Sequence, residues 1–491
     1  MDFADFILQH QADDPATLAL SRPKYADFPE FSLALSTLEA RRKLRGKVPE
    51  WLDLPSLHFP YPLGAEQCSS SETAKYKAMQ IWEEVYPQCE SQGAIRRPGR
   101  SVTFVSKSWK GLEAGRGLGA GPQYISEGGH RFQRAHLLPD EICIADLTGG
   151  LGVDCWAFAK AGFKVMYNDM RKELVEAARH NFAELGVDGI EFRCAEVKPG
   201  GIDGILGSFK ADAFFLDPAR RDSSGGKVFR IADCSPDVSA LLPELFRHAR
   251  FVLIKLSPML DITQGARDLG DTVKEIHVVG ADGECKELLY LLDREHNGEY
   301  SITVYDNGST LTFQPAEERD ATAHMGSGPK TGVNGPEVGK YQGFRPENPA
   351  KRAGDKPGEP QGYLFEPGKA LLKAGCFKLI SQRFKIAKAG INTHLYFAKE
   401  PLQELSPFGK WFRILETCHL DKRGIRAIGT KYPQADVTAR GVPLTSDELK
   451  KRLGVQSGSS GVHIFAAHSD IKGENLLIVS SAVRFPQETC L

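Results

Sequence analysis

One short run of the sequence, ADLTGGLGVD, places three glycines between two aspartates. In order, the run contains Asp146, Thr148, Gly149, Gly150, Gly152 and Asp154. The apolar residues before it predict a strand, those after it predict a helix, and a glycine-rich turn between two such elements is a common way to hold a nucleotide cofactor. The next predicted strand, KVMYND, ends at Asp169, whose carboxylate can accept hydrogen bonds from both hydroxyls of a ribose. The run therefore predicts a site for a ribose-bearing cofactor.

The spacing of the glycines favours one class of cofactor. A dinucleotide fingerprint needs G-x-G-x-x-G, and Cys155 stands where the third glycine belongs. Asp154 would also place negative charge beside a pyrophosphate at the helix N-terminus. S-adenosylmethionine (SAM) has no phosphate, and Asp146 could meet its ammonium group while the glycines let the backbone approach it. We expect SAM, with a dinucleotide or a purely structural helix cap as the alternatives.

The run FFLDPARRD contains a second group of residues that could do chemistry. A strand ending in Asp217-Pro218 would place a carboxylate and a rigid backbone carbonyl at the carboxyl edge of a sheet, where open α/β sheets bind ligands. Both accept hydrogens from an exocyclic amine, which is a poor nucleophile because its lone pair is delocalised. Arg220, followed by Arg221, could hold a phosphate or a carboxylate, or pair with a nearby aspartate. We therefore expect Asp217, Pro218 and Arg220 to be catalytic.

Two departures from known motifs narrow the chemistry. Amino-methylating enzymes have a similar Asp/Asn-Pro-Pro-aromatic motif, but Ala219 takes the third position here and no aromatic residue follows to stack on a flipped base. Asp-Pro-x-Arg also resembles RNA 5-methyluridine enzymes, which need a cysteine after the next strand. Ser257 stands there, and a serine is too weak a nucleophile for that addition. Lys255, in the same strand, is expected either to help bind substrate or to be a surface charge.

Alternating strands and helices must position these residues. From about residue 141 the runs ICIADL, KVMYND, IEFRCAEV, ADAFFLDP and FVLIKLSP predict strands, with helical runs between them. Apolar strands alternating with helices indicate an α/β fold with a parallel sheet that is covered on both faces. The later runs VKEIHVVG, CKELLYLLDR and YSITVYD predict a strand, a helix and a strand.

Shifts in composition divide the chain into six segments. We expect a helical N-terminal region at 1–92, a Gly/Arg-rich loop or linker at 93–140, the α/β core at 141–308, a flexible linker at 309–361, and two small α/β units at 362–400 and 401–491. The second linker is predicted because residues 314–361 hold 7 Pro and 8 Gly among 48 residues. In the N-terminal region, Ser69 and Glu72 fit a capping box for a helix that runs to about Tyr86.

Charge is distributed unevenly along the chain. The net charge is −1, but residues 362–491 carry 19 Lys/Arg and 11 Asp/Glu, a net of +8. This asymmetry favours a nucleic-acid-binding C-terminal end, with solvated helix faces as the alternative. The 10 cysteines include no C-x-x-C pair, so neither a metal site nor a disulfide framework is indicated. No membrane span or signal peptide is apparent, so we expect a cytoplasmic protein; the sequence does not indicate its oligomeric state.

The motifs of the core are those of one enzyme class. DLTGGLGVD is similar to the first motif of class I SAM-dependent methyltransferases, and YNDM is similar to the second, over about residues 140–308. CAEV stands where the third motif places an acid near the adenine. The resemblance therefore implies a Rossmann-like core and makes Glu196 a further cofactor contact.

Stretches over most of the chain from Glu66 onward resemble a bacterial family of methyltransferases with a THUMP-like C-terminal domain. They are EQCSSSETAKYKA, DLTGGLGVD, LDPARR, IADCSPD, KLSPMLDI, GECKELL, EPGKALLKAG and NTHLYFA. The family implies a ferredoxin-like unit at 362–400 and an RNA-binding THUMP-like domain at 401–491. The EQCSS segment is interpreted as a helix cap, or as a cover over the cofactor through Gln67, Ser69 or Ser70. GLGVD also resembles a ribosomal-RNA guanine-N2 methyltransferase, by analogy only.

The leading hypothesis is an enzyme that moves a methyl group from SAM to an exocyclic amine of an RNA base, with rRNA or tRNA as partner. Two alternatives remain. One is methylation of a small molecule or a protein, and the other is an RNA-binding protein whose methyltransferase fold no longer works.

Overall fold

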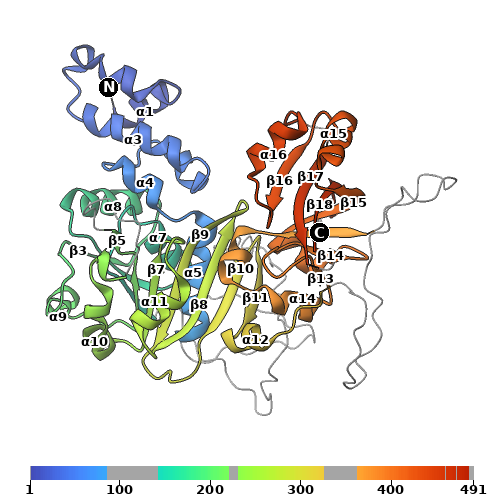
Figure 1. Ribbon diagram of the computed structural model, residues 1–491. Coiled ribbons are helices and arrows are strands. Elements are labelled where there is room, and N and C mark those ends of the chain that lie inside the picture. Colours follow the sequence, from blue (N-terminus) through green and yellow to red (C-terminus); the bar gives the residue numbers. More distant parts are fainter. Residues whose placement is uncertain are drawn as a thin grey trace, which may run out of the picture. The chain divides into compact units, whose positions relative to one another are not determined.

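The computed structural model in Figure 1 describes residues 2–85, 142–220, 231–325, 362–458, 461–470 and 473–485. The chain divides into two compact units. Unit 1 comprises the described residues up to Ile276 together with Glu287–Glu299, and unit 2 comprises His277–Lys286 and the described residues from Tyr300 onward. The loop or linker expected at 93–140 lies outside the described residues. None of the described helices is both long and apolar enough to span a membrane.

The N-terminal region of unit 1 is helical, as its apolar spacing predicts. Its helices are α1 (Phe3–His10), α2 (Pro15–Ala19), α3 (Phe31–Leu44), α4 (Pro62–Gln67) and α5 (Ser71–Val85). The predicted capping box at Ser69 is wrong, because Ser70 is the residue whose hydroxyl accepts the Thr73 N–H, at 3.2 Å. The Ser69 hydroxyl has a different partner, described below.

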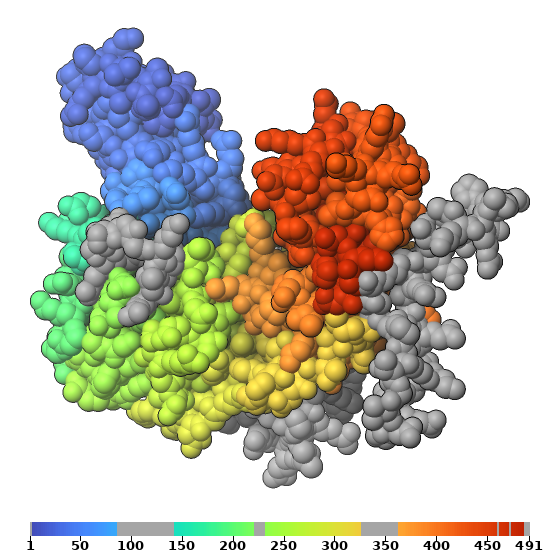
Figure 2. Space-filling view, in the orientation of Figure 1, coloured from blue at the N-terminus to red at the C-terminus, as the bar shows by residue number. Residues whose placement is uncertain are grey.

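These helices pack directly on the core of unit 1. Figure 2 shows them in blue against the green segments of the core. The His58 N–H donates to Asn181 Oδ1 at 2.7 Å, Asn181 donates back to the His58 carbonyl, and the rings of His58 and His180 stack with centroids 3.9 Å apart. Burial and the neighbouring His180 lower the pKa of His58 to about 4. The N-terminal helices and the core therefore form one folded body.

The core of unit 1 is a largely parallel sheet. Its strands are β1 (Cys143–Asp146), β2 (Lys164–Asn168), β3 (Ile190–Arg193), β4 (Ala213–Leu216), β7 (Phe251–Leu256) and β9 (Glu284–Asp293), in the order β9-β7-β4-β1-β2-β3. All pairs are parallel except β7 with β9. The intervening helices are α7 (Val153–Lys160), α8 (Lys172–Glu184), α9 (Ile202–Leu206), α10 (Val238–His248) and α11 (Ile262–Leu269). The predicted α/β fold is confirmed.

One predicted helix of the core is wrong. The run CKELLYLLDR forms strand β9, which pairs with β7 so that Lys255 lies opposite Leu289. Residues 288–292 are all buried, as happens when both faces of a strand are covered, whereas a helix of this length would turn some of them to solvent. Strand β8 (Val273–Ala281), like β9, has residues in both units.

The hairpin that follows β9 in unit 2 includes residues that were expected to lie in a linker. Strands β10 (Ser301–Asp306) and β11 (Ser309–Phe313) pair across Asn307 and Gly308, both of which have positive φ. The helix α12 (Pro315–Asp320) follows, and its Glu318 accepts the backbone N–H groups of Lys378 and Leu379. The linker expected at 309–361 is therefore wrong at its start, and 326–361 lies outside the described residues.

The rest of unit 2 forms a second sheet. Its strands are β12 (Tyr363–Pro367), β13 (Ala387–Lys388), β14 (Tyr396–Ala398), β15 (Gly409–His419), β16 (Asp436–Arg440), β17 (Val462–Ser469) and β18 (Glu474–Ala482), and its helices are α13 (Lys369–Ala374), α14 (Lys378–Phe384), α15 (Lys422–Lys431) and α16 (Ser446–Leu453). The strand order is β13-β14-β12-β15-β18-β17-β16, with β12 and β15 antiparallel. The two small α/β units expected on either side of residue 400 therefore share one sheet.

Candidate functional site

The predicted site residues lie at the carboxyl ends of neighbouring parallel strands. β1 ends at Asp146, β2 ends one residue before Asp169, and β4 ends one residue before Asp217. Lys255 is the penultimate residue of β7, which pairs with β4. Because parallel strands present their carboxyl ends at one edge of the sheet, the topology brings these four side chains to the edge where α/β proteins bind ligands.

Asp146 is buried beneath the glycine loop, with 1% of its surface exposed. Its carboxyl group accepts the Thr148 N–H at 3.0 Å and the Cys155 thiol at 3.1 Å. Burial raises the pKa of Asp146 to about 8, and the negative charges of Asp154 and Asp217 add to this effect. A cationic ligand group at this carboxyl would favour its ionised form.

This shifted pKa makes a prediction about stability. An aspartate in the unfolded chain loses its proton near pH 4, whereas folded Asp146 keeps it to about pH 8, so the folded state binds one more proton between these values. Asp146 therefore reduces stability as pH rises through this window, by about 1.4 kcal/mol per pH unit. We therefore expect the free energy of unfolding of Asp146→Asn, measured in urea, to increase relative to that of the wild type by this amount for each pH unit between pH 5 and 7. A constant difference between the two proteins would contradict the prediction.

Asp169 is fixed to the glycine loop. One carboxylate oxygen accepts the Gly150 N–H at 3.1 Å, and the other accepts the Arg171 N–H at 2.8 Å. Gly150 has a φ of +54°, and a Cβ there would meet only the Thr148 carbonyl oxygen, at 3.9 Å, so this side of Gly150 is nearly open. Asp169 therefore lies next to the open side of Gly150. A ligand that approached the loop at Gly150 would have the Asp169 carboxylate beside it, as a ribose contact requires.

The other two predicted loop glycines have a different reason to be glycine. A Cβ on Gly149 would lie 2.2 Å from the ring of Tyr167, and a Cβ on Gly152 would lie 2.7 Å from Phe182. The Tyr167 hydroxyl also donates to the Gly150 carbonyl at 2.6 Å. We expected all three glycines to make room for a ligand. The rings of Tyr167 and Phe182 thus explain why Gly149 and Gly152 are glycine, and the contact of these two residues with a ligand stays a prediction.

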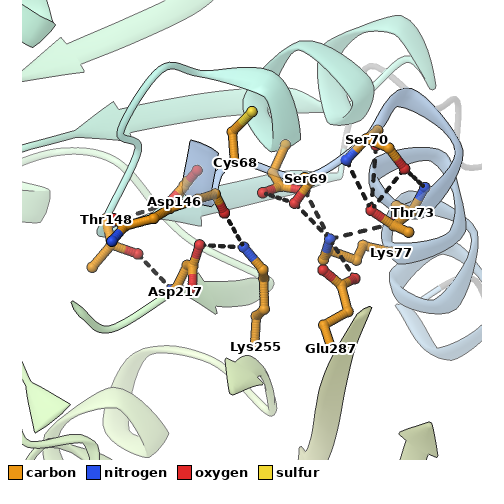
Figure 3. A network of polar contacts seen from close by, with 12 residues as sticks. Cys68, Ser69, Ser70, Thr73, Lys77, Asp146, Thr148, Asp217, Lys255 and Glu287 are labelled. Atoms are coloured by element: carbon orange, nitrogen blue, oxygen red, sulfur yellow. Dashed lines mark hydrogen bonds and ion pairs between the residues drawn. The ribbon is translucent and has the colours of Figure 1, made fainter. Parts of the chain in front are cut away.

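Asp154 is bound within the protein. One of its oxygens accepts the Ser69 hydroxyl at 2.9 Å, and the other is 3.2 Å from the ammonium group of Lys77. Lys77, on α5, has no exposed side-chain surface and also lies 2.7 Å from Glu287 Oε1 and 2.8 Å from Ser69 Oγ (Figure 3). Asp154 therefore joins the start of α7 to α5 and, through Lys77, to β9. The cofactor contact predicted for Asp154 has no support in these contacts.

Lys77 and Glu287 are the members of this cluster that the sequence analysis missed. Their signal was weak but present. Lys77 lies on the helix face that also carries the buried residues Ala74 and Ile81, where an apolar residue is the normal choice. Glu287 directly precedes five buried apolar residues of β9.

Asp217 is attached to both the glycine loop and β7. Its N–H donates to Thr148 Oγ1 at 2.6 Å, and its Oδ2 is 2.5 Å from Lys255 Nζ. Lys255 Nζ also donates to the Gln67 carbonyl at 3.4 Å. The Lys255 side chain is 10% exposed and that of Asp217 is 35% exposed, so the carboxylate faces outward from a lysine that lies beneath it. Of the two interpretations of Lys255, the surface charge is wrong.

Electrostatics keep Lys255 charged. Burial alone would lower the pKa of this lysine, but the negative charges of Asp217, Glu287 and Asp154 raise it above the ordinary value. Lys255 is therefore an ammonium group at neutral pH, available as a hydrogen-bond donor and unable to act as a base.

The remaining predicted residues lie near the same edge. Pro218 is buried directly after Asp217, and Arg220 is in β5 (Ala219–Arg220), which pairs with β6 (Cys234–Ser235). Glu196 follows β3, is exposed and pairs with Lys198 at 3.4 Å. No ligand contact is established for these three residues, and their roles stay predictions.

The groups at this edge fit SAM better than a phosphate-bearing cofactor. The side chains of Asp146, Asp169 and Asp217 offer carboxyl oxygens as acceptors, and a cationic ligand group would favour the ionised form of Asp146, which suits an ammonium, a sulfonium and a pair of ribose hydroxyls. A pyrophosphate would need donors and positive charge instead. The open side of Gly150 gives a ligand access to the backbone of the loop.

Comparisons with known proteins agree with this geometry. Residues 363–405 match a family described as a ferredoxin-like domain, and residues 409–482 match one described as THUMP domain-like. Two proteins of Mycobacterium tuberculosis, from strains CDC 1551 and H37Rv, are described as uncharacterized SAM-dependent methyltransferases. Each is 23% identical to this chain over 322 residues, which is 65% of this chain and 75% of the relative.

A solved structure extends the likeness to nearly the whole chain. The crystal structure of a presumed methyltransferase from Porphyromonas gingivalis W83 matches with a TM-score of 0.69 at 23% identity, covering 98% of each chain. The fold predicted from the sequence is thereby confirmed. The chain is a homologue of the SAM-dependent methyltransferases, with a ferredoxin-like and a THUMP-like domain after its Rossmann-like core.

Proposed function

We propose that this chain transfers a methyl group from SAM to an exocyclic amine of an RNA base. The observation that carries the proposal is the placement of Asp217, an outward-facing carboxylate joined to the glycine loop through Thr148. SAM would supply a methyl group on a sulfonium, and the new bond to nitrogen forms as the bond to sulfur breaks, with the electron pair left on sulfur.

Residues around the glycine loop are proposed to bind the cofactor. Asp169 would accept the ribose hydroxyls, Asp146 would face the ammonium group, and the backbone at Gly150 would lie against the ligand. Glu196, from the end of β3, would lie near the adenine. The support for these roles is their shared position at the carboxyl edge of the sheet.

Asp217 and the Pro218 carbonyl are proposed to orient the acceptor amine. Oδ2 of Asp217 is held by Lys255, whereas no donor among the described residues reaches Oδ1. Oδ1 can therefore accept a hydrogen from the amine and hold its nitrogen in line with the methyl group. The methylated nitrogen is cationic, and it loses one proton to this carboxylate and then to water. Arg220, two residues beyond Pro218, is proposed to hold a phosphate of the substrate.

Unit 2 supports RNA as the substrate class. Lys422, Arg423 and Arg426 on α15, and Lys451 and Arg452 on α16, are exposed, and none forms a salt bridge with a described residue. Three of them, Lys422, Arg426 and Arg452, line a groove between the two helices. Unpaired cations beside a groove are suited to a phosphate backbone.

Neutralising this groove is expected to weaken RNA binding. Each lost phosphate contact reduces the slope of log K against log salt concentration by about 0.7–0.9, so the triple variant Lys422→Gln, Arg426→Gln, Arg452→Gln should lose about 2–3 in slope. Fluorescence anisotropy with a labelled RNA duplex at several salt concentrations measures this change.

A matched variant tests whether the effect is local. Lys385, Lys399 and Lys410 are also exposed in unit 2 and lie away from α15 and α16 in the sequence. Replacing these three lysines by Gln changes the net charge by the same amount as the groove variant does. We expect it to leave most of the slope of log K against log salt concentration unchanged. An equal loss in both variants would count against the groove.

The proposed reaction is tested by modified-nucleoside mass spectrometry of rRNA and tRNA from cells with and without the gene. We expect one methylated nucleoside to disappear without the gene and to be restored by the purified protein with SAM. If every nucleoside persists and labelled methyl appears in protein or small molecules, RNA is the wrong substrate. If calorimetry detects no SAM binding, the chain is not an enzyme of this class.

A further inference from the structure

We propose that Lys255 is a positioning residue, which holds one oxygen of Asp217 so that the other faces the acceptor amine. The inference rests on the proposed function and adds the residue that sets the direction of the acceptor carboxylate.

The register between β4 and β7 brings Asp217 and Lys255 side by side. Leu216 of β4 lies opposite Ile254 of β7, so Asp217 and Lys255 are the next residues in register on adjacent parallel strands. The distance from Lys255 Nζ to Asp217 Oδ2 is 2.5 Å, and the Gln67 carbonyl accepts from the same ammonium group at 3.4 Å. With two fixed partners, Lys255 limits the rotation of the Asp217 side chain.

Lys77 is the ion-pair partner of the two other acids near Lys255, which are Asp154 and Glu287. Asp154 and Glu287 are close enough to raise the pKa of Lys255, but the ammonium group of Lys77 lies 3.2 Å from Asp154 and 2.7 Å from Glu287. Figure 3 shows Lys77 pointing toward Glu287. The charge of Lys77 is thus shared by these two acids. Lys255 is left to pair with Asp217.

The test uses three variants of the full chain, assayed with labelled SAM and RNA from cells that lack the gene. For Lys255→Met we expect a fall in kcat of at least tenfold at pH 7, while the KM for RNA and the SAM affinity stay within twofold of the wild type. Lys255→Gln keeps a donor but loses the charge and should show the same split between kcat and KM, which preserves the test if the Met variant fails to fold. Lys255→Arg keeps a charged donor and should restore kcat.

Lys164→Met is the matched control, because Lys164 also pairs with an acid, Glu191 at 3.3 Å, but at the amino end of β2. Its kcat and KM should be those of the wild type. An unchanged kcat in both Lys255→Met and Lys255→Gln would overturn the role of Lys255 while leaving the proposed function in place. Absence of methyl transfer to RNA by the wild type would overturn the proposed function, and the inference with it.

Discussion

Replacing Lys77 by methionine is expected to lower the free energy of unfolding by about 3–5 kcal/mol. Lys77 has no exposed side-chain surface, and its ammonium group lies between Asp154 and Glu287. The variant would leave two buried carboxylates without their counter-charge, which costs far more than the loss of an exposed pair. Urea unfolding followed by circular dichroism at pH 7 measures the change.

Two further variants separate charge from packing. Lys75→Met, on the same helix, removes a partly exposed partner of Glu50 and should cost no more than about 1 kcal/mol. Adding Asp154→Asn and Glu287→Gln to Lys77→Met removes the stranded charges and should recover much of the loss. If Lys77→Met unfolds at the same urea concentration as the wild type, the cluster does not stabilise unit 1.

Replacing Asp217 by alanine is expected to reduce kcat for methyl transfer by about 10²–10³-fold, by analogy with the loss of one group that stabilises charge in a transition state. The carboxylate provides the acceptor that orients the amine and balances the positive charge that grows on its nitrogen. SAM affinity should stay near that of the wild type, because the contact of Asp217 with the glycine loop is made by its backbone N–H. Single-turnover kinetics and calorimetry measure the two quantities separately.

The complementary change is Asp169→Ala, which should reduce SAM affinity because this carboxylate lies against Gly150 of the loop. Asp212→Ala is the control, since Asp212 lies just before the amino end of the same strand as Asp217 and accepts the Cys143 N–H. A full rate in Asp217→Ala would remove Asp217 from the mechanism. Equal loss in Asp212→Ala would point to an effect on the strand.

The placement of the acidic site residues could be predicted because it depends on local pattern and simple topology. Asp146, Asp169 and Asp217 each follow an apolar run, and the carboxyl ends of parallel strands must share one edge. The cluster of Lys77 could not be predicted in the same way, because its three charges come from positions 77, 154 and 287. A lysine on an amphipathic helix normally reaches solvent, and only the fold shows that this one does not.

Two errors in the fold have physical causes. Five consecutive apolar residues in β9 have no periodicity that distinguishes a helix from a strand covered on both faces. The second strand of the hairpin β10–β11 was wrongly included in the predicted linker, because the linker is indicated by the glycines and prolines of 314–361 but was expected to start at residue 309. Asn307-Gly308 is a strong turn signal for a hairpin, and its positive φ angles are those that a two-residue turn requires.

The cluster around Lys77 also has a consequence for synthesis on the ribosome. Lys77 and Glu287 are 210 residues apart, so at ordinary elongation rates roughly 10–40 s separate their appearance. During that interval α5 can form, but its lysine lacks one of the two acids that it meets in the finished protein. The N-terminal helices therefore cannot reach their final packing as an early, independent step, and unit 1 completes its fold only after β9 has been made.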